Sequence, residues 1–354
     1  MKRMILLTVM IISCMVLLQC TTADQREEIN LSHHDVPQEP SIYLNYEGKD
    51  DVLSGGVKMI PISTEKGEFN VWTKRIGNNP TTKVLLLHGG PGATHEYFEC
   101  FDSYFPNADI EYYYYDQLES AFSDQPSDSA LWNIDRFVEE VEQVRVALGL
   151  NKDNFYLLGH SWGGILGIEY ALKYQDNLKG LIISNMVASI PEYITYANEV
   201  LGPQLDSAVL AEIRELEEKE DYANPRYDEL VVMNYYPKHV LRMPLEQWPD
   251  PVNRAFANIN AEMYVTMQGP SEFGVVGDAK LKKWDRKADL KNLSVPTLAI
   301  GSRYDTMDPE AMKWMSEEVQ NGTYLYCPQG SHMSMYDDQK VYFDGLIQFI
   351  KGID

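Results

Sequence analysis

The chain has 354 residues, of which 44% are hydrophobic and 11% aromatic, and its formal net charge is −23. A protein this acidic would be repelled by nucleic acid and by anionic membrane surfaces, so we expect neither as a binding partner. The length suits two domains, or one α/β core with a large insertion, and the apolar content is sufficient for a substantial core.

The N-terminus has the pattern of an export signal. Lys2 and Arg3 precede an almost uninterrupted apolar run over residues 4–18, which is rather short for a membrane span. Cys14 and Cys20 each follow a sequence that resembles a bacterial lipobox, whose cysteine becomes the lipid-bearing first residue. Cys14 has the better small residue before it, whereas Cys20 is better placed, at the end of the apolar run.

We therefore expect residues 1–20 to be a signal peptide and residues 21–50 a polar tether. The exported protein would be a lipoprotein of the periplasm or cell surface that touches the membrane only through its lipid anchor. An ordinary cleaved signal and a retained anchor are the alternatives.

Strands and helices alternate through most of the remaining chain, which predicts a mainly parallel sheet covered on both faces. Two antiparallel edge strands are expected at residues 56–62 and 69–74. The apolar runs that predict further strands lie at residues 84–87, 112–116, 155–158, 181–184, 295–300 and 323–326. Helical periodicity is found over residues 134–148, 163–172 and 342–353.

The pattern changes between residues 191 and 277. This stretch reads as helical, is acidic in part, and contains no apolar strand run. It interrupts the strand-helix alternation, so we expect an inserted unit.

A strong catalytic signal lies where the strand at 155–158 meets the helix that follows it. The sequence there is Gly159-His160-Ser161-Trp162-Gly163, and a Gly-x-Ser-x-Gly between strand and helix is the nucleophile elbow of α/β-hydrolases. The tight turn strains the serine backbone and only glycines tolerate the crowding around it. We therefore expect an α/β-hydrolase core from residues 51–188 and 287–354, with residues 189–286 as a helical cap over the active site.

The elbow serine needs a histidine base and an acid, which follow it in the order acid, then histidine. Only His332 among the seven histidines follows the late strands. Asp305 and Asp308 both follow the strand that ends at Ile300. Asp305 is closer to the strand end, whereas Asp308 precedes a proline and has the pattern of a helix N-cap. The predicted triad is Ser161, Asp305 and His332.

The oxyanion of an acyl-transfer intermediate needs about two fixed N–H donors. One is expected from Trp162, the residue after the nucleophile. The other is expected from Gly90 in the loop His88-Gly89-Gly90-Pro91-Gly92, which follows the strand at 84–87.

No metal site or cofactor is predicted. His95 and the glutamates that follow it lack the second histidine of a zincin helix. Cys100 and Cys327 lie in apolar or aromatic surroundings and are expected to be buried free thiols rather than a disulfide.

Five segments together resemble the proline iminopeptidase family. They are His88 to Gly92, Tyr115-Asp116-Gln117, Gly159 to Gly164, Met267-Gln268-Gly269-Pro270-Ser271-Glu272-Phe273, and Gly330-Ser331-His332-Met333. The resemblance extends from about residue 56 to the C-terminus. It implies an α/β-hydrolase that removes N-terminal residues, often proline, from short peptides with a free N-terminus.

The resemblance also implies that Glu272 is the cap glutamate that binds the substrate amine; a surface glutamate in a turn is the alternative. In tricorn-associated relatives a second glutamate follows the triad aspartate, but this chain has Thr306 there. The glycine-rich stretch that usually follows Tyr-Asp-Gln is also altered. Glu119 within it either replaces the lost charge or is a solvent-exposed glutamate.

The sequence thus predicts a serine exopeptidase that releases N-terminal proline or other small or apolar residues from short peptides. An amino-acid amidase or esterase of the same fold is the nearest alternative. A non-catalytic hydrolase-like binding protein is a more distant one, because such a protein is expected to lack a triad member.

Overall fold

The computed structural model describes Tyr43 and residues 55–353. They belong to one compact unit, Pro40–Asp354. The predicted signal peptide, both lipobox cysteines and the tether other than Tyr43 lie outside the described residues. Within the described part, no helix is both long and apolar enough to cross a membrane.

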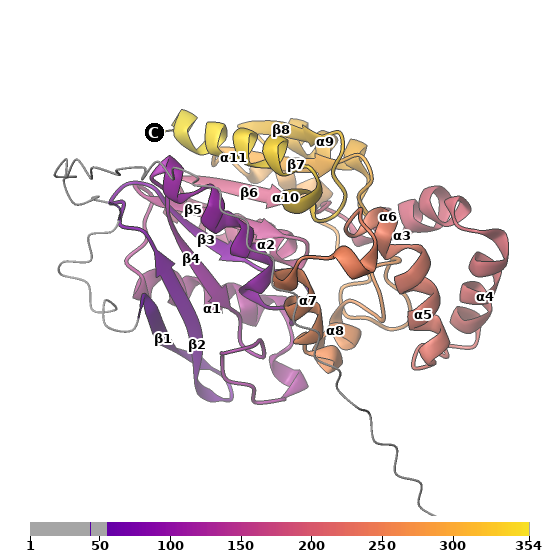
Figure 1. Cartoon of the computed structure of the whole chain (residues 1–354). Helices are drawn as coiled ribbons and strands as arrows, with labels where there is room; N and C mark the ends of the chain where they lie inside the picture. The colour runs from indigo at the N-terminus through magenta and orange to yellow at the C-terminus, as the bar shows by residue number, and fades with distance from the viewer. Residues whose placement is uncertain (1–42, 44–54, 354) are drawn as a thin grey trace, which may run out of the picture. The chain divides into compact units, whose positions relative to one another are not determined.

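The core is an eight-stranded sheet in the order β1-β2-β4-β3-β5-β6-β7-β8 (Figure 1). β1 and β2 pair antiparallel, β2 pairs antiparallel with β4, and all remaining pairs are parallel. The strand bounds are Val57–Thr64, Gly67–Ile76, Lys83–Leu87, Glu111–Asp116, Phe155–His160, Gly180–Ser184, Thr297–Ser302 and Gly322–Cys327 for β1 to β8. The predicted fold class is confirmed.

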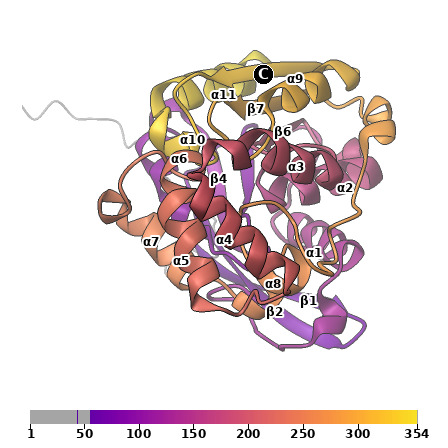
Figure 2. The same ribbon diagram turned by 90° about the vertical axis from the view of Figure 1, so that its right-hand side faces the viewer.

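The central strands β3 to β7 are buried along their whole length. Parallel strands that are covered on both faces have near-continuous apolar sequences, which is why these five were recognisable as short apolar runs. Figure 2 shows α1 (Ile134–Ala147) and α2 (Trp162–Tyr174) on one side of the sheet and α11 (Gln339–Ile353) on the other.

The cap helices lie between β6 and β7 in the chain and beyond the carboxyl ends of the parallel strands (Figure 1). They are α3 (Ile190–Tyr196), α4 (Ser207–Glu218), α5 (Pro225–Asn234), α6 (Tyr236–His239), α7 (Asp250–Ala257) and α8 (Ala261–Met267). An isolated antiparallel bridge joins Ser189 to Asp285, where the chain leaves the core and returns to it.

The two remaining α-helices of the described residues follow the late strands. They are α9 (Pro309–Glu318) and α10 (Ser334–Asp337). Asp308 is the N-cap of α9 and its carboxylate accepts the Glu310 N–H at 2.9 Å, as the sequence predicted. Cys327 is a buried free thiol, whereas Cys100 is free but only partly buried, so its predicted burial was too strong.

Candidate active site

Ser161 occupies a strained turn between β5 and α2. Its backbone angles are φ 56° and ψ −126°, a left-handed conformation that is costly for any residue other than glycine. The turn closes only because two neighbours have no side chain. A Cβ at Gly159 would lie 1.9 Å from the Gly163 carbonyl oxygen, and one at Gly163 would lie 2.1 Å from that of Leu87. This is the crowding that a nucleophile elbow requires.

Asp305 and His332 form a buried hydrogen-bonded pair. The His332 Nδ1–H donates to Asp305 Oδ1 at 2.8 Å. The other carboxylate oxygen accepts the Asn185 side-chain amide at 2.7 Å, and the Met307 N–H donates to Oδ1 at 3.1 Å. Asp305 is fully buried, so these donors stabilise its charge in place of water. They also fix the carboxylate that orients the imidazole.

The electrostatics of His332 are a balance of two opposing effects. Burial disfavours the imidazolium, but the charge of Asp305 and its hydrogen bond favour it more strongly, so the pKa of His332 is raised above its ordinary value. A histidine with this pKa accepts a proton readily during the reaction. Ser161 and His332 line the same cavity but are not hydrogen-bonded to each other in this conformation; such bonds often tighten only when substrate is bound.

The two expected oxyanion donors lie far apart in the chain, Gly90 in the loop after β3 and Trp162 where the turn at Ser161 meets α2. Gly90 has φ 108°, and the preceding amide, Gly89 N–H, is already used in a 2.6 Å bond to the Tyr97 hydroxyl. Trp162 is the first residue of α2, where a backbone N–H has no partner within the helix. The positive end of the α2 dipole adds to the attraction for an anion beside Ser161.

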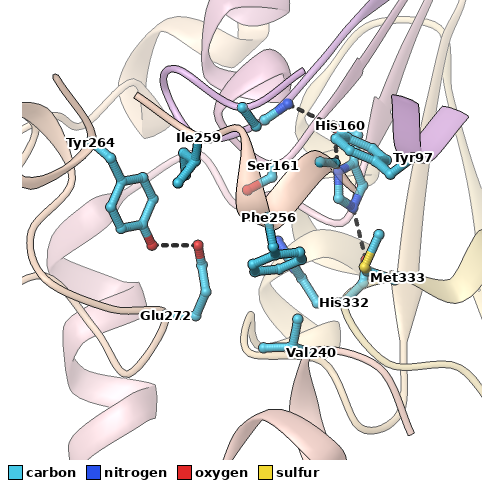
Figure 3. A pocket seen from close by; sticks show the side chains of 14 residues that line it. Tyr97, His160, Ser161, Val240, Phe256, Ile259, Tyr264, Glu272, His332 and Met333 are labelled. Atoms are coloured by element: carbon cyan, nitrogen blue, oxygen red, sulfur yellow. Dashed lines mark hydrogen bonds between the residues drawn. The ribbon is translucent and has the colours of Figure 1, made fainter. Parts of the chain in front are cut away.

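These groups surround a small apolar cavity of about 50 Å³. Besides Ser161 and His332, the cavity is lined by Gly89, Gly90, Ala93, Tyr97, His160, Val240, Ala255, Phe256, Ile259, Tyr264, Glu272 and Met333. Figure 3 shows Tyr264 and Glu272 on one side of the cavity and His332 and Met333 on the other. The cavity therefore places a carboxylate across from the nucleophile within largely apolar walls.

Three tyrosines from three cap helices hold Glu272. The Tyr264 hydroxyl donates to Glu272 Oε1 at 2.5 Å, the Tyr193 hydroxyl donates to the Glu272 carbonyl oxygen at 2.6 Å, and the Glu272 N–H donates to the Tyr236 hydroxyl at 3.3 Å. Glu272 is 9% exposed, and no cationic side chain of residues 55–353 forms an ion pair with it. A surface glutamate in a turn, the alternative for this residue, is wrong.

Glu119 and Thr306 do not contribute to the cavity wall. Glu119 is 1% exposed, so its interpretation as a solvent-exposed residue is wrong, and its Oε1 accepts the Trp132 indole N–H at 3.2 Å. Neither residue is among those that line the cavity around Ser161. The Thr306 hydroxyl lies 3.3 Å from both Asp305 Oδ1 and His332 Nδ1, behind the catalytic imidazole. Among the described residues, Glu272 is thus the one carboxylate in the cavity wall.

His160 is a site residue for which the sequence predicted no role. Its Nε2–H donates to the His332 carbonyl oxygen at 2.8 Å, and its Nδ1 accepts the Tyr97 hydroxyl at 3.1 Å. Burial, and then the nearby His332, lower the pKa of His160 to about 3, so the ring is neutral. It supports the catalytic loop without adding charge. Its position directly before the nucleophile was the only available signal.

The described residues contain no group of three or more His, Cys, Asp or Glu side chains that could hold a metal ion.

Comparison with known proteins places this site in a family. The alpha/beta hydrolase fold family matches residues 82–339. The proline iminopeptidase of Elizabethkingia meningoseptica is 61% identical over 296 residues, which are 84% of this chain and 98% of that protein. The proline iminopeptidase of Saccharolobus solfataricus is 34% identical over 276 residues, which are 76% of this chain and 85% of that protein.

A solved structure agrees with these relatives. The crystal structure of the proline iminopeptidase of Mycobacterium smegmatis superposes with a TM-score of 0.72 at 25% identity, over 84% of this chain and 98% of that one. The chain therefore belongs to the proline iminopeptidase family of serine-type α/β-hydrolases.

Proposed function

We propose that this protein hydrolyses the peptide bond that follows an N-terminal proline, or another small apolar residue, in short peptides with a free N-terminus. The observation that carries the proposal is Glu272. A nearly buried carboxylate with no cationic partner is costly unless a cation arrives with the substrate. The charged N-terminal amine of a peptide is such a cation.

The chemistry follows from the order of groups across the cavity. With the amine at Glu272, the carbonyl of the first residue lies at Ser161, whose oxygen attacks while His332 takes the proton. The backbone N–H groups of Gly90 and Trp162 stabilise the oxyanion. The imidazolium then protonates the leaving amine, an acyl-enzyme forms, and a water activated by His332 releases the free amino acid.

The size and polarity of the cavity support a small apolar first residue. Its volume is about 50 Å³, and the side chains of Val240, Phe256 and Ile259 contribute apolar surface to it. A proline ring buries apolar surface against such walls without requiring any further hydrogen bond.

The test compares substrates with and without an amine. Glu272→Gln should lower kcat/KM for proline p-nitroanilide by about 10²–10⁴, because leaving one member of a buried charge pair unpartnered costs roughly 3–5 kcal/mol. Hydrolysis of phenyl acetate, which has no amine, should change little. Acetylating the proline nitrogen should cause a similar loss in the wild-type protein, and Glu272→Gln should add little to that loss.

Two variants serve as controls. Glu262→Gln changes an exposed glutamate on α8 and should have wild-type kinetics. Ser161→Ala should remove both activities, since losing a triad member costs on the order of 10⁴–10⁶ in rate. An equal loss on both substrates in Glu272→Gln would reject the amine-binding role and favour a general amidase or esterase.

We also propose that the protein is exported and lipid-anchored through Cys14 or Cys20. Support comes from the basic start, the apolar run and the two lipobox-like sequences. Mass spectrometry of the native N-terminus should find an acylated cysteine as the first residue. An unmodified first residue after Cys20, or retention of Met1, would reject the anchor.

A further inference from the structure

The two N–H groups of the oxyanion hole come from loops that are far apart in the chain, so something must fix their relative position. We infer that His88 and Gln117, two buried residues outside the triad, are positioning residues that join these loops and aim both donors. The inference rests on the proposed acyl transfer at Ser161, since it concerns the stabilisation of that reaction's oxyanion.

Gln117 contacts both loops with a single side chain. It follows β4 and is fully buried. Its Nε2–H donates to the His88 carbonyl oxygen at 3.0 Å, and its Oε1 accepts the Trp162 indole N–H at 2.9 Å. The amide thus ties the start of the Gly90 loop to the side chain of the residue that supplies the second donor. A displacement of either loop would break one of these bonds.

The His88 ring continues the connection to Gly90. The Gln117 backbone N–H can only donate, so the His88 Nε2 that it meets at 3.1 Å must be the acceptor. The hydrogen is therefore on Nδ1, which donates to the Gly89 carbonyl oxygen at 2.9 Å. Burial lowers the pKa of His88 to about 4, against the opposing effect of Asp116, so this neutral tautomer persists at neutral pH.

The bond to Gly89 acts on Gly90 through the geometry of the peptide unit. The Gly89 carbonyl and the Gly90 N–H belong to the same rigid plane and, in a trans peptide, point in opposite directions. A hydrogen bond that fixes the carbonyl therefore fixes the direction of the N–H. Because Gly90 has no side chain and φ 108°, its own backbone preferences would leave this direction poorly determined.

A positioning role differs from a packing role in that it affects binding of the transition state more than binding of the ground state. The two are therefore distinguished by kcat and by the affinity for a transition-state analogue. Gln117→Met keeps the length of the side chain but removes both of its hydrogen bonds. We expect kcat for proline p-nitroanilide to fall by about 10–10²-fold with KM within about threefold of wild type, since small errors in donor position cost this much. The inhibition constant of proline boronic acid, whose tetrahedral adduct carries an oxygen in the oxyanion hole, should rise by the same factor as kcat falls. That of L-proline should stay unchanged.

A second variant removes the other partner of the hydrogen bond between Gln117 and Trp162. Trp162→Phe keeps the backbone donor but removes the indole N–H that Gln117 accepts. It should lower kcat in the same way, and the double variant should lose less than the product of the two single losses. Gln125→Met is the matched control, because Gln125 is an exposed glutamine on the same loop. It should behave as wild type.

The outcomes separate this inference from the proposed function. The positioning role is rejected if Gln117→Met and Trp162→Phe keep kcat within about twofold of wild type. It is also rejected if the variants raise the inhibition constants of L-proline and proline boronic acid by equal factors. If Gln117→Met does not fold, as judged by its thermal transition, Trp162→Phe is judged by the same criteria. If the wild-type protein cleaves phenyl acetate but no prolyl substrate, the proposed substrate is wrong while the inference about the oxyanion hole is still testable. The kcat for phenyl acetate would then be compared between Gln117→Met, Trp162→Phe and the wild type.

Discussion

Asp305 and Asp308 are three positions apart but have unrelated tasks. The first is buried and binds the imidazole, whereas the second caps α9. The difference lies in burial and partners, because both are carboxylates at the carboxyl end of the same strand. Asparagine substitution separates the two tasks, since it keeps the size of the side chain but removes its charge.

Asp305→Asn should lower kcat for proline p-nitroanilide by about 10⁴, because the amide favours the wrong imidazole tautomer and does not stabilise the imidazolium. Asp308→Asn should leave kcat near wild type, since asparagine is an equally good N-cap. Steady-state kinetics of the two variants decide the assignment. A severe defect in Asp308→Asn beside an active Asp305→Asn would transfer the role of the acid to Asp308.

The raised pKa of His332 predicts where activity is lost on the acidic side. The imidazole must be neutral to accept the serine proton, so kcat/KM should fall as the pH drops through a pKa above the usual 6.5. Asp305→Asn removes the charge that raises this pKa, so the remaining activity of that variant should persist to lower pH. A pH profile of kcat/KM for both proteins gives the two midpoints. A midpoint that moves to higher pH in the variant would contradict this account of His332.

At the scale of elements, ion pairs from α7 connect the cap to the core beside the cavity. Arg254 on α7 forms ion pairs with Glu96, with Glu99 at 2.7 Å and with Asp250 at 2.8 Å. Glu96 and Glu99 belong to the 3-10 helix η3 (His95–Ser103). The neighbours of Arg254, Ala255 and Phe256, line the cavity, as does Tyr97 of η3. The network therefore holds two walls of the cavity together.

Arg254→Ala should raise KM for proline p-nitroanilide by about threefold to tenfold with a smaller effect on kcat, since single exposed pairs contribute up to about 1 kcal/mol and this residue makes several. The KM of the wild type should rise with salt, which screens such pairs, and that of the variant should be less sensitive. Kinetics in dilute buffer and in 1 M NaCl test this. Arg226→Ala removes exposed pairs with Glu212 and Glu229 on the cap and should change neither value. If Arg254→Ala had the wild-type KM and the wild-type dependence of KM on salt, these ion pairs would not hold the cavity walls together.

Length and periodicity decide which elements could be predicted from the sequence. Every strand of the sheet lies at a predicted apolar or edge run. For β3 to β7 the signal comes from burial on both faces, which requires a continuous apolar sequence. η3 was not predicted, and the cap was recognised only as a helical stretch. Its helices are short, between the 4 residues of α6 and the 12 of α4, so few turns are available to establish a period.

The site residues also differ in how far the sequence determines them. Ser161, Asp305 and His332 could be placed from chain order, because the fold fixes which strand ends carry each member. Asn185 could not, since it is 120 residues from Asp305 in the chain and the two meet only when their segments pack. Tyr264 could not either, since its bond to Glu272, eight residues further on, depends on how the chain turns after α8. Glu119 was misjudged for a related reason. Its burial depends on Trp132 and on cap residue Asn260, which donates to its carbonyl oxygen at 3.1 Å, and not on its polar neighbours in sequence.

At the scale of the whole molecule, the compact unit begins well before the first strand. Tyr43 is buried, and its hydroxyl donates to the Ile110 carbonyl oxygen at 3.1 Å. Its ring also covers Gly77, where an added Cβ would come within 2.5 Å of it. Tyr43 lies inside the segment that the sequence predicted to be a polar tether, so at this residue the interpretation is wrong. Ile110 precedes β4 whereas Ser161 follows β5, and both strands run parallel to β3, so the contact and the nucleophile lie at opposite ends of these strands. The contribution of Tyr43 should therefore be to stability alone.

In a protein that begins at Pro40, Tyr43→Ala should lower the free energy of unfolding by about 2–4 kcal/mol, because a large buried ring is lost and its space is left unfilled. Tyr43→Phe keeps the ring but loses the hydrogen bond to Ile110, so about 1 kcal/mol is expected from that bond. Urea denaturation measures both, and kcat/KM for proline p-nitroanilide should remain at the wild-type value. Tyr326→Ala, which truncates an exposed tyrosine on β8, controls for the loss of a ring as such. If Tyr43→Ala were as stable as this control, the compact unit would not depend on residue 43. If Tyr43→Ala lowered kcat/KM without lowering the free energy of unfolding, Tyr43 would affect the active site, and the expectation that it contributes only to stability would be wrong.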